Sequence, residues 1–220
     1  MSKIEELTKA LIDELEKLDE AEKINEMNEI KKSLHRISPF KSEPVDCIIW
    51  IPADHIYAND YNPNRVAPPE MELLHTSIKE DGYTQPVVAC DLKAVGESET
   101  EHWEVVDGFH RNRVGKERQD VARRIHGSLP VSSLVKTRKE RIAATIRHNR
   151  ARGTHQIRLM SDIVLDLTRY GYSDSEICTQ LGMELDEVIR LKQITGLKEA
   201  FQNHEFSKSW EEFESKYYSE

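Results

Sequence analysis

A junction between a predicted strand and a predicted helix lies near the middle of the chain and limits the fold more than any other feature. The stretch EHWEVVDG, residues 101–108, is rich in β-branched and aromatic residues, which is typical of a strand. The stretch RNRVGKERQDVARRI, residues 111–125, has apolar residues at helical spacing. Around this junction lie further predicted strands at 45–51, 85–95 and 129–135, and further predicted helices at 71–82 and 138–152. The middle of the chain is therefore expected to form an α+β domain.

Helical patterns occupy both ends of the chain. The first 38 residues place apolar side chains at helical spacing between glutamates and lysines, which predicts one or two amphipathic helices. Pro39 and Pro44 mark a linker after them. From His155 onward the pattern is helical throughout. We therefore expect three parts, which are N-terminal amphipathic helices at 1–38, an α+β domain at 45–152 and a helical domain at 153–220.

The helical domain contains the spacing of a helix-turn-helix. Ser173 is a predicted N-cap, Gly182 is a predicted turn, and the apolar face continues from Val188 in a second helix. The same pattern also fits a helical hairpin that serves only for packing. In the tail, one helical stripe of aromatic residues either packs on the protein's own core or binds a partner; it consists of Phe206, Trp210, Phe213 and Tyr217.

The distribution of charge argues against a general nucleic-acid binder. The formal net charge is -9 at pH 7, yet residues 107–152 contain 13 lysines and arginines and only four acids. A concentrated basic centre in an acidic protein favours a localised anion, such as a nucleotide, over a long track of DNA.

Membrane and zinc proteins are also disfavoured. No apolar run approaches the ~18 residues of a membrane span, and the N-terminus lacks the pattern of a secretory signal. The cysteines Cys47, Cys90 and Cys178 are far apart and form no CxxC pair, which predicts reduced thiols and no zinc ligands. We therefore expect a cytoplasmic protein and assign no metal ligands.

The junction itself predicts an anion site. Gly108 permits close approach of the backbone, and the N–H groups at a helix N-terminus are donors for phosphate. His110, Arg111 and Arg113 follow at once, and Arg111 is suited to bind phosphate oxygens bidentately. The alternative is a structural arginine network that pairs with acidic helices. Asp107 is the candidate catalytic residue, because a carboxylate beside phosphate orients a nucleophile or holds Mg²⁺, and its alternative role is a helix cap.

Four motifs followed by the helix-turn-helix occur in an order that resembles the ParB/sulfiredoxin superfamily. The motifs are IPADHIYANDYNPNR, ELLHTSIKEDGYTQPVVA, WEVVDGFHRNRVG and RHNRARGTH. Their wording is most similar to the IbrB group of prophage gene-expression co-activators. The resemblance covers residues 45–197 and implies a small mixed-sheet nucleotide-binding domain followed by an all-helical, helix-turn-helix-like domain. It also implies a phosphoadenosine-phosphosulfate-reductase-like partner.

The family's nucleotide pocket is carried over by matching motifs. Its Gly-x-x-Arg-x-Arg stretch corresponds to Gly108, Arg111 and Arg113, with His110 where another arginine is common. The other implied pocket residues are Gly82, Gln85 and Pro86 from one motif and His148, Asn149 and Arg152 from another. His148 replaces the glutamate that helps to hold magnesium in ParB. Phe109 replaces the cysteine of sulfiredoxins, which excludes sulfiredoxin chemistry.

Three functions stay open on this basis. The first is a nucleotide-binding and nucleotide-hydrolysing subunit, with ATP favoured over CTP and with Mg²⁺, that acts with its partner or as a homo-oligomer. The second is a DNA-binding co-activator of prophage genes with nucleotide as regulator. For this function the acidic start of the second helix, with Glu184, Asp186 and Glu187, predicts weak or indirect DNA binding. The third is a small-metabolite kinase, for which the sequence identifies no acceptor pocket.

Overall fold

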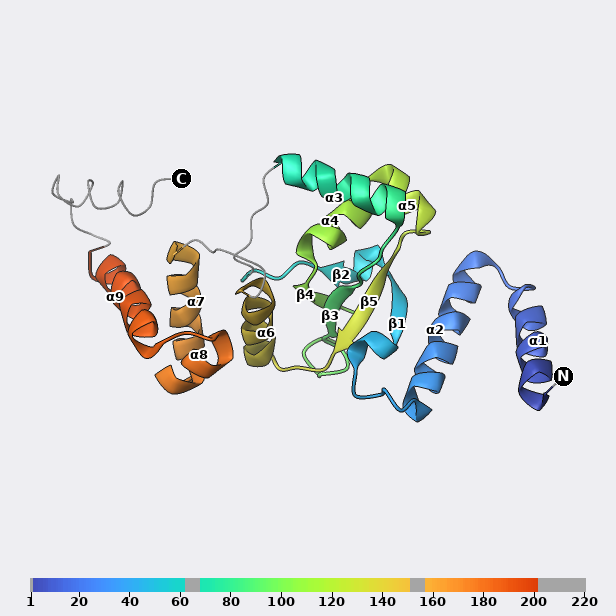
Figure 1. Ribbon diagram of the computed structural model, residues 1–220, viewed down its shortest axis with the longest axis horizontal. Helices are drawn as coiled ribbons and strands as arrows, with labels where there is room; N and C mark the ends of the chain where they lie inside the picture. The colour runs from blue at the N-terminus through green and yellow to red at the C-terminus, as the bar shows by residue number, and fades with distance from the viewer. Residues whose placement is uncertain (1, 62–67, 151–156, 202–220) are drawn as a thin grey trace. The chain divides into compact units, whose positions relative to one another are not determined.

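Two compact units make up the protein (Figure 1), and each is described by itself. The computed structural model describes residues 2–61, 68–150 and 157–201. The first unit comprises residues Met1–Ala58 and Ala67–Val135, and the second comprises Asn59–Val66 and Lys136–Glu220.

A mixed five-stranded sheet forms the centre of the first unit. Its strands are β1 (Ile48–Pro52), β2 (Ile56–Tyr57), β3 (Val87–Asp91), β4 (Trp103–Asp107) and β5 (Ser128–Leu134). The strand order is β1-β5-β3-β4-β2. The β1–β5 and β3–β4 pairs are antiparallel, whereas the β3–β5 and β2–β4 pairs are parallel. The expected α+β class with a small mixed sheet is therefore confirmed.

The first unit also contains helices. They are α1 (Lys3–Leu15), α2 (Glu20–Ile37), α3 (Pro68–Asp81), α4 (Phe109–Glu117) and α5 (Gln119–Arg124), with short 3₁₀ turns η1 (Pro44–Asp46) and η2 (Ala53–His55) on either side of β1. Helix α4 packs against β3 and β5, and α3 packs against α4 and α5 (Figure 1). Strand β4 is buried at all five of its positions. The next residue, Gly108, is the N-cap of α4, so the chain passes from the core directly into this helix.

Helix α2 covers the free edge of the sheet at β1. The side chain of Asn28 is almost fully buried there. Its Nδ2 donates to the backbone oxygen of Trp50 at 2.7 Å, and its Oδ1 accepts from the backbone nitrogen of Trp50 at 2.9 Å. One amide side chain thus replaces the neighbouring strand that an edge lacks, which satisfies the backbone and blocks pairing with another chain.

The second unit is helical. Its helices are α6 (Arg138–Arg150), α7 (Ile157–Arg169), α8 (Asp174–Leu181) and α9 (Leu185–Phe201). They share one apolar core, to which Ile146, Leu167, Ile177 and Val188 contribute. The predicted helix-turn-helix is present, because Ser173 caps α8 in a capping box with Glu176, and Gly182 ends it at φ 62°.

One local prediction was wrong, and one strand was missed. The single helix predicted over 111–125 is two helices, because the backbone of Arg118 is extended (φ -95°, ψ 107°) and separates α4 from α5. At this break the Arg118 side chain reaches Glu72 on α3. Strand β2 was not predicted, since a strand of two residues is too short for an alternating pattern.

Three further predictions concern the C-terminal aromatic stripe, the domain boundary and membrane spans. The aromatic stripe Phe206, Trp210, Phe213 and Tyr217 lies outside the described residues. The first unit ends at Val135, so α6 belongs to the second unit, and the sequence-based domain boundary after residue 152 stays a prediction. Within the described ranges, no helix combines the length and apolar character needed to cross a membrane.

Candidate functional site

Gly108 joins β4 to α4 in the left-handed conformation that favours glycine, at φ 86° and ψ 28°. It is the N-cap of α4, where no side chain accepts a capping hydrogen bond and no acid occupies the first turn. The backbone N–H of Gly108 donates to Oδ1 of Asp107 at 2.7 Å. The strand therefore changes into a helix within one residue. The backbone N–H groups in the first turn of α4 can donate hydrogen bonds to an anion.

The side chain of Arg111 folds back over Gly108. A Cβ atom placed on Gly108 would lie 3.0 Å from both Nε and Nη2 of Arg111. Nη1 donates to Oε1 of Gln85, and Nη2 lies 3.5 Å from Oδ2 of Asp107. The side chains of Arg111 and Asp107 are only 13% and 6% exposed. The structure thus brings together four predicted site residues from three segments: Gln85, Asp107, Gly108 and Arg111.

The loop that carries Gln85 is shaped by Gly82 and Pro86. Gly82 is left-handed at φ 79°, and its N–H donates to the oxygen of Ile78 at 3.0 Å, which ends α3. The guanidinium of Arg124 also donates to the last carbonyls of α3, including that of Ile78 at 2.6 Å. Pro86 directly precedes β3. These two predicted residues therefore position the loop, and Gln85 supplies the contact to Arg111.

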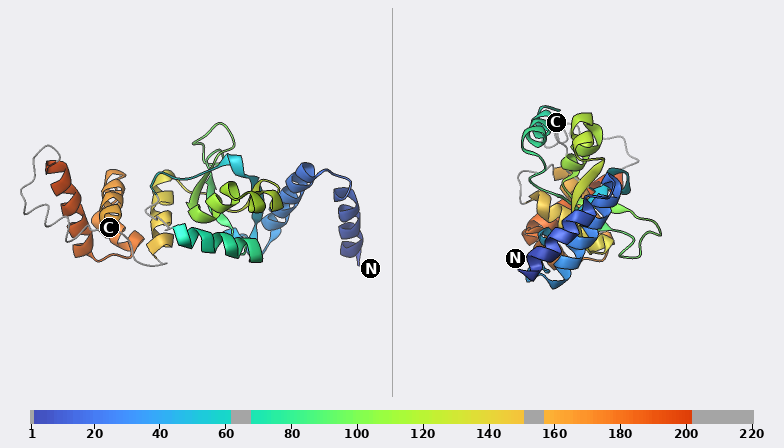
Figure 2. Two further views of the ribbon diagram at one scale, coloured as in Figure 1. Left: turned by 90° about the horizontal axis from the view of Figure 1, so that it is seen from above. Right: turned by 90° about the vertical axis from the view of Figure 1, so that its right-hand side faces the viewer.

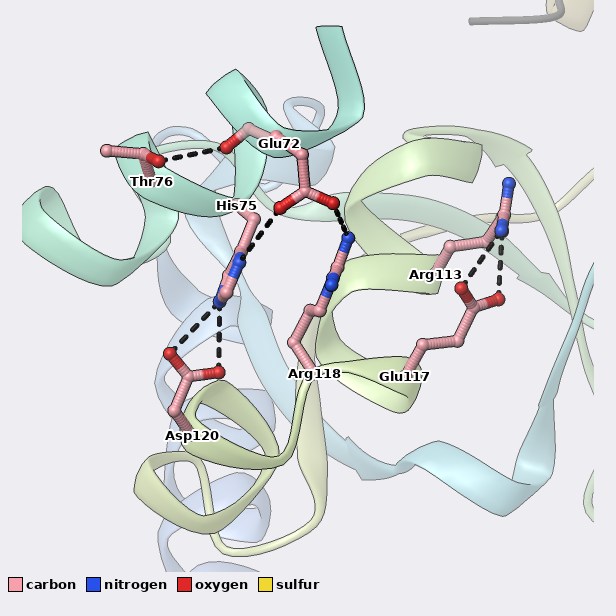
Figure 3. Close-up of polar contacts among 7 residues, drawn as sticks. All are labelled: Glu72, His75, Thr76, Arg113, Glu117, Arg118 and Asp120. Atoms are coloured by element: carbon pink, nitrogen blue, oxygen red, sulfur yellow. Dashed lines mark hydrogen bonds and ion pairs between the residues drawn. The ribbon is translucent and has the colours of Figure 1, made fainter. Parts of the chain in front are cut away.

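The positive charges at the start of α4 have partners within the protein. Arg113 forms a bidentate ion pair with Glu117, at 2.8 and 2.9 Å, on an exposed side of α4 (Figure 3). Burial lowers the pKa of His110, and the nearby charge of Arg113 lowers it further, so this imidazole is neutral at pH 7. Arg111 faces Asp107. The cluster of basic residues therefore does not by itself require a bound anion.

The motif near residue 150 lies in the second unit. His148 is half-buried on α6, Asn149 lies on the same helix, and Arg152 is outside the described residues. Its participation in one pocket with Arg111 stays a prediction.

Two residues that support Arg111 were not predicted. The hydroxyl of Tyr83 donates to the backbone oxygen of Arg111 at 2.8 Å. Burial raises the pKa of Tyr83 to about 12, so the hydroxyl keeps its proton and remains a donor. A Cβ on Gly115 would lie 2.4 Å from this hydroxyl and 2.3 Å from Cδ2 of Leu129, so glycine is needed there. Tyr83 lies inside the EDGYTQP motif, which was the available signal for it.

A polar cluster that was also not predicted links α3 to the break between α4 and α5 (Figure 3). Nε2 of His75 lies 2.9 and 3.0 Å from the two oxygens of Asp120, and Nδ1 lies 3.9 Å from Oε2 of Glu72. Arg118 binds the other oxygen of Glu72. The hydrogen bond with His75 holds the pKa of the Asp120 carboxyl below its ordinary value. This cluster fixes the helix that carries Arg111 relative to α3.

The second helix of the helix-turn-helix begins with acids. Asp186 and Glu187 occupy the first turn of α9, and Arg190 is engaged by Asp186 at 3.0 Å. Lys192 is likewise paired, with Asp174. The end of the helix that contacts bases in helix-turn-helix proteins is therefore negative here.

In the ranges that the structure describes, no group of three or more His, Cys, Asp and Glu side chains is placed to hold a metal ion.

Two family models match most of the chain. The model described as "ParB N-terminal domain" matches residues 37–146, and the model described as "IbrB-like C-terminal HTH domain" matches residues 155–203. The "Uncharacterized protein YbdM" of Escherichia coli (strain K12) is 49% identical over 204 residues, which are 93% of this chain and 95% of the relative.

Two solved structures of C-terminally truncated ParB from Caulobacter crescentus are also similar, each at 16% identity. The complex with CTP-gamma-S has a TM-score of 0.39 and covers 71% of this chain and 87% of that chain. The complex with the centromeric parS site has a TM-score of 0.44 and covers 64% and 68%. From the matches to the two family models and the near-complete relative, the chain belongs to the family that joins a ParB N-terminal domain to an IbrB-like C-terminal helix-turn-helix domain.

Proposed function

We propose that the first unit binds the phosphates of a nucleoside triphosphate at the N-terminus of α4. The observation that carries this proposal is the position of the Arg111 guanidinium over Gly108, close enough that a Cβ on Gly108 would lie 3.0 Å from it. Glycine keeps the space open, the helix N-terminus supplies N–H donors, and the guanidinium supplies charge. Membership of the ParB N-terminal domain family supports the same location.

The contacts of Arg111 fit this role. Gln85 and Asp107 hold its guanidinium beside the start of α4, and a guanidinium held in one orientation is suited to bind phosphate oxygens. Tyr83 fixes the backbone at Arg111, and this reduces the reorganisation needed on binding. Gln85 orients the guanidinium and lies in the family's first motif.

Asp107 requires a cation if phosphate enters, because a buried carboxylate otherwise repels it. The ordinary solution is Mg²⁺, which binds one or two carboxylates together with phosphate oxygens and water. Because the described residues place no group of three or more His, Cys, Asp and Glu side chains together, Asp107 would hold such an ion with phosphate oxygens and water, and the ion would neutralise charge on the transferred phosphate. Asp107 would then position a water molecule for hydrolysis, with ATP favoured and CTP as the alternative.

Substitution of Arg111 tests the proposal. We expect Arg111→Ala to lose most of its affinity for nucleotide, since truncating a desolvated charged contact costs about 2–5 kcal/mol. Calorimetric titration with ATP, CTP, GTP and ADP, with and without Mg²⁺, measures this. Arg123→Ala removes the same charge from an exposed position on α5 and serves as the matched control. Equal nucleotide binding by folded Arg111→Ala and by the parent would place the site elsewhere.

A phosphoadenosine-phosphosulfate-reductase-like partner is the second part of the proposal and rests on resemblance to IbrB-like proteins. If this partner is required for turnover, hydrolysis appears only when both proteins are present. DNA binding is the alternative function, and the helix-turn-helix of the second unit favours it. The acidic start of α9 limits that function to weak or partner-assisted contact.

A further inference from the structure

Helix α2 carries a second, exposed apolar face beside the one that packs on the sheet. The first face contacts β1 through Asn28, and Ile24 and Met27 line one cavity with Trp50 of β1. The second face has the spacing of a helix-packing seam, i, i+7 and i+10, and consists of Met27, Leu34 and Ile37. These side chains are 44%, 60% and 81% exposed. A continuous apolar seam of this kind on one helix marks an interaction surface.

Helix α1 carries a matching apolar face that none of the described residues buries. Ile4, Leu7 and Leu11 share one side of the helix and are 75%, 58% and 40% exposed. No residue of α1 is buried. A capping box of Ser2 and Glu5 stabilises the start of the helix, but an isolated helix of 13 residues is marginal in water. A stable α1 therefore needs a surface against its apolar side.

The two faces lie on segments of opposite charge. Helix α1 contains four acids and two lysines. The C-terminal half of α2 and the linker that follows, residues 29–42, contain four lysines and arginines and one acid, Glu29, which pairs with Lys32 at 2.8 Å. Opposite charge favours the pairing of α1 with this part of α2 over the pairing of either segment with itself.

We propose that the chain forms a two-fold symmetric dimer through α1 and α2. Helix α1 of one copy lies on the Met27, Leu34 and Ile37 face of α2 in its partner, and symmetry makes the same contact twice. One association step then covers both exposed faces in both copies as an antiparallel four-helix arrangement. Figure 2 shows that α1 and α2 lie at one end of the first unit, joined by a short turn. The inference is independent of nucleotide binding.

The first experiment measures the oligomeric state of the full chain. We expect sedimentation velocity to detect a dimer that dissociates on dilution and weakens with added salt. Leu7→Asp with Leu11→Asp is expected to raise the dissociation constant by at least about a hundredfold, because two buried leucines are replaced by charges. Leu34→Asp with Ile37→Asp is expected to do the same. Leu73→Asp on α3, which is 71% exposed, is the control that keeps the dimer.

The second experiment separates contact between copies from contact within one copy. Cys47 and Cys178 are replaced by Ser, while Cys90 stays because it is fully buried. One protein then carries Leu7→Cys and the other Leu34→Cys, and a short bis-maleimide is added to the mixture. We expect a linked dimer that contains one copy of each. Leu73→Cys in place of Leu34→Cys should give no linked product.

Three outcomes would overturn the proposal. A monomer at every concentration tested removes the dimer. A dimer that survives both pairs of aspartate substitutions lies on another surface. A monomer whose melting temperature falls with Leu7→Asp and Leu11→Asp shows that α1 closes on its own α2. Melting curves of each variant are recorded beside the sedimentation data for this reason.

Discussion

Arg111 connects most of the features of the proposed site. Its backbone is held by Tyr83, its guanidinium by Gln85 and Asp107, and its position over the helix start depends on Gly108. An arginine fixed in this way loses less side-chain entropy when a phosphate arrives. The site is therefore prepared before binding.

Asp107 allows a sharper test of chemistry. Asp107→Asn keeps the shape and the contact to the Gly108 N–H through its amide oxygen but removes the negative charge. We expect nucleotide affinity to stay and Mg²⁺-dependent turnover to fall, because the carboxylate would hold the ion and the water. Phosphate release, measured with and without the proposed partner, checks this. Turnover by the variant at the parent rate would assign Asp107 a purely structural role.

At this scale the sequence was most informative where a motif fixes the backbone. Gly108, Arg111 and Asp107 could be placed together because they lie within five residues at the start of a helix. Tyr83 and Gly115 could not be placed, since their roles depend on distances between α4, β5 and the loop after α3. Periodicity carries no information on such contacts between elements.

The contact between α3 and α5 is sensitive to acid. His75 and Asp120 meet at 2.9 Å, and the pKa of Asp120 is lowered mainly by that hydrogen bond. A carboxyl with a lowered pKa in the folded state stabilises the fold above its ordinary pKa. That contribution is lost as the pH falls through the lowered value.

Asp120→Asn is therefore expected to lower the melting temperature at neutral pH. The gap in melting temperature between the variant and the parent is expected to become smaller as the pH falls below the ordinary carboxyl range. Melting curves between neutral pH and pH 3 measure the gap. Asp81→Asn, which changes an exposed acid at the end of α3, is the matched control. A gap that stays constant with pH would show that the carboxylate charge does not stabilise this contact.

The order and type of most elements were predictable, because the apolar periods are long on α2 and α7 and the strands are rich in β-branched residues. The division between α4 and α5 was not predictable, because neither Arg118 nor a residue next to it is a glycine or proline that would indicate a helix break. The break coincides with the contact of Arg118 to Glu72 on α3. A tertiary contact thus accompanies a change in backbone that local propensity does not indicate.

The proposed phosphate site and the helix-turn-helix, whose second helix has an acidic first turn, lie in different units of the chain. We expect DNA binding that is weak, salt-sensitive and without preferred sequence. Replacing Asp186 with Asn and Glu187 with Gln should strengthen it, because Arg190 is released from Asp186 and two repulsive charges are removed. Fluorescence anisotropy over a range of salt measures both effects.

The same charge change on α3, by Glu80→Gln with Asp81→Asn, is the control and should leave DNA affinity nearly unchanged. A sequence-specific footprint of the parent at physiological salt would contradict the prediction and support the co-activator function.

The pairing of the first strand with the last has a consequence for synthesis of the chain. β1 hydrogen-bonds only with β5 among the described strands, so it emerges from the ribosome long before its neighbour exists. β3 likewise lacks its parallel neighbour until β5 has been synthesised. Such late closure slows folding and leaves strand edges open in the nascent chain. A message truncated just before Ser128 would therefore yield a product that aggregates, even though nearly all of the proposed phosphate site had already been translated.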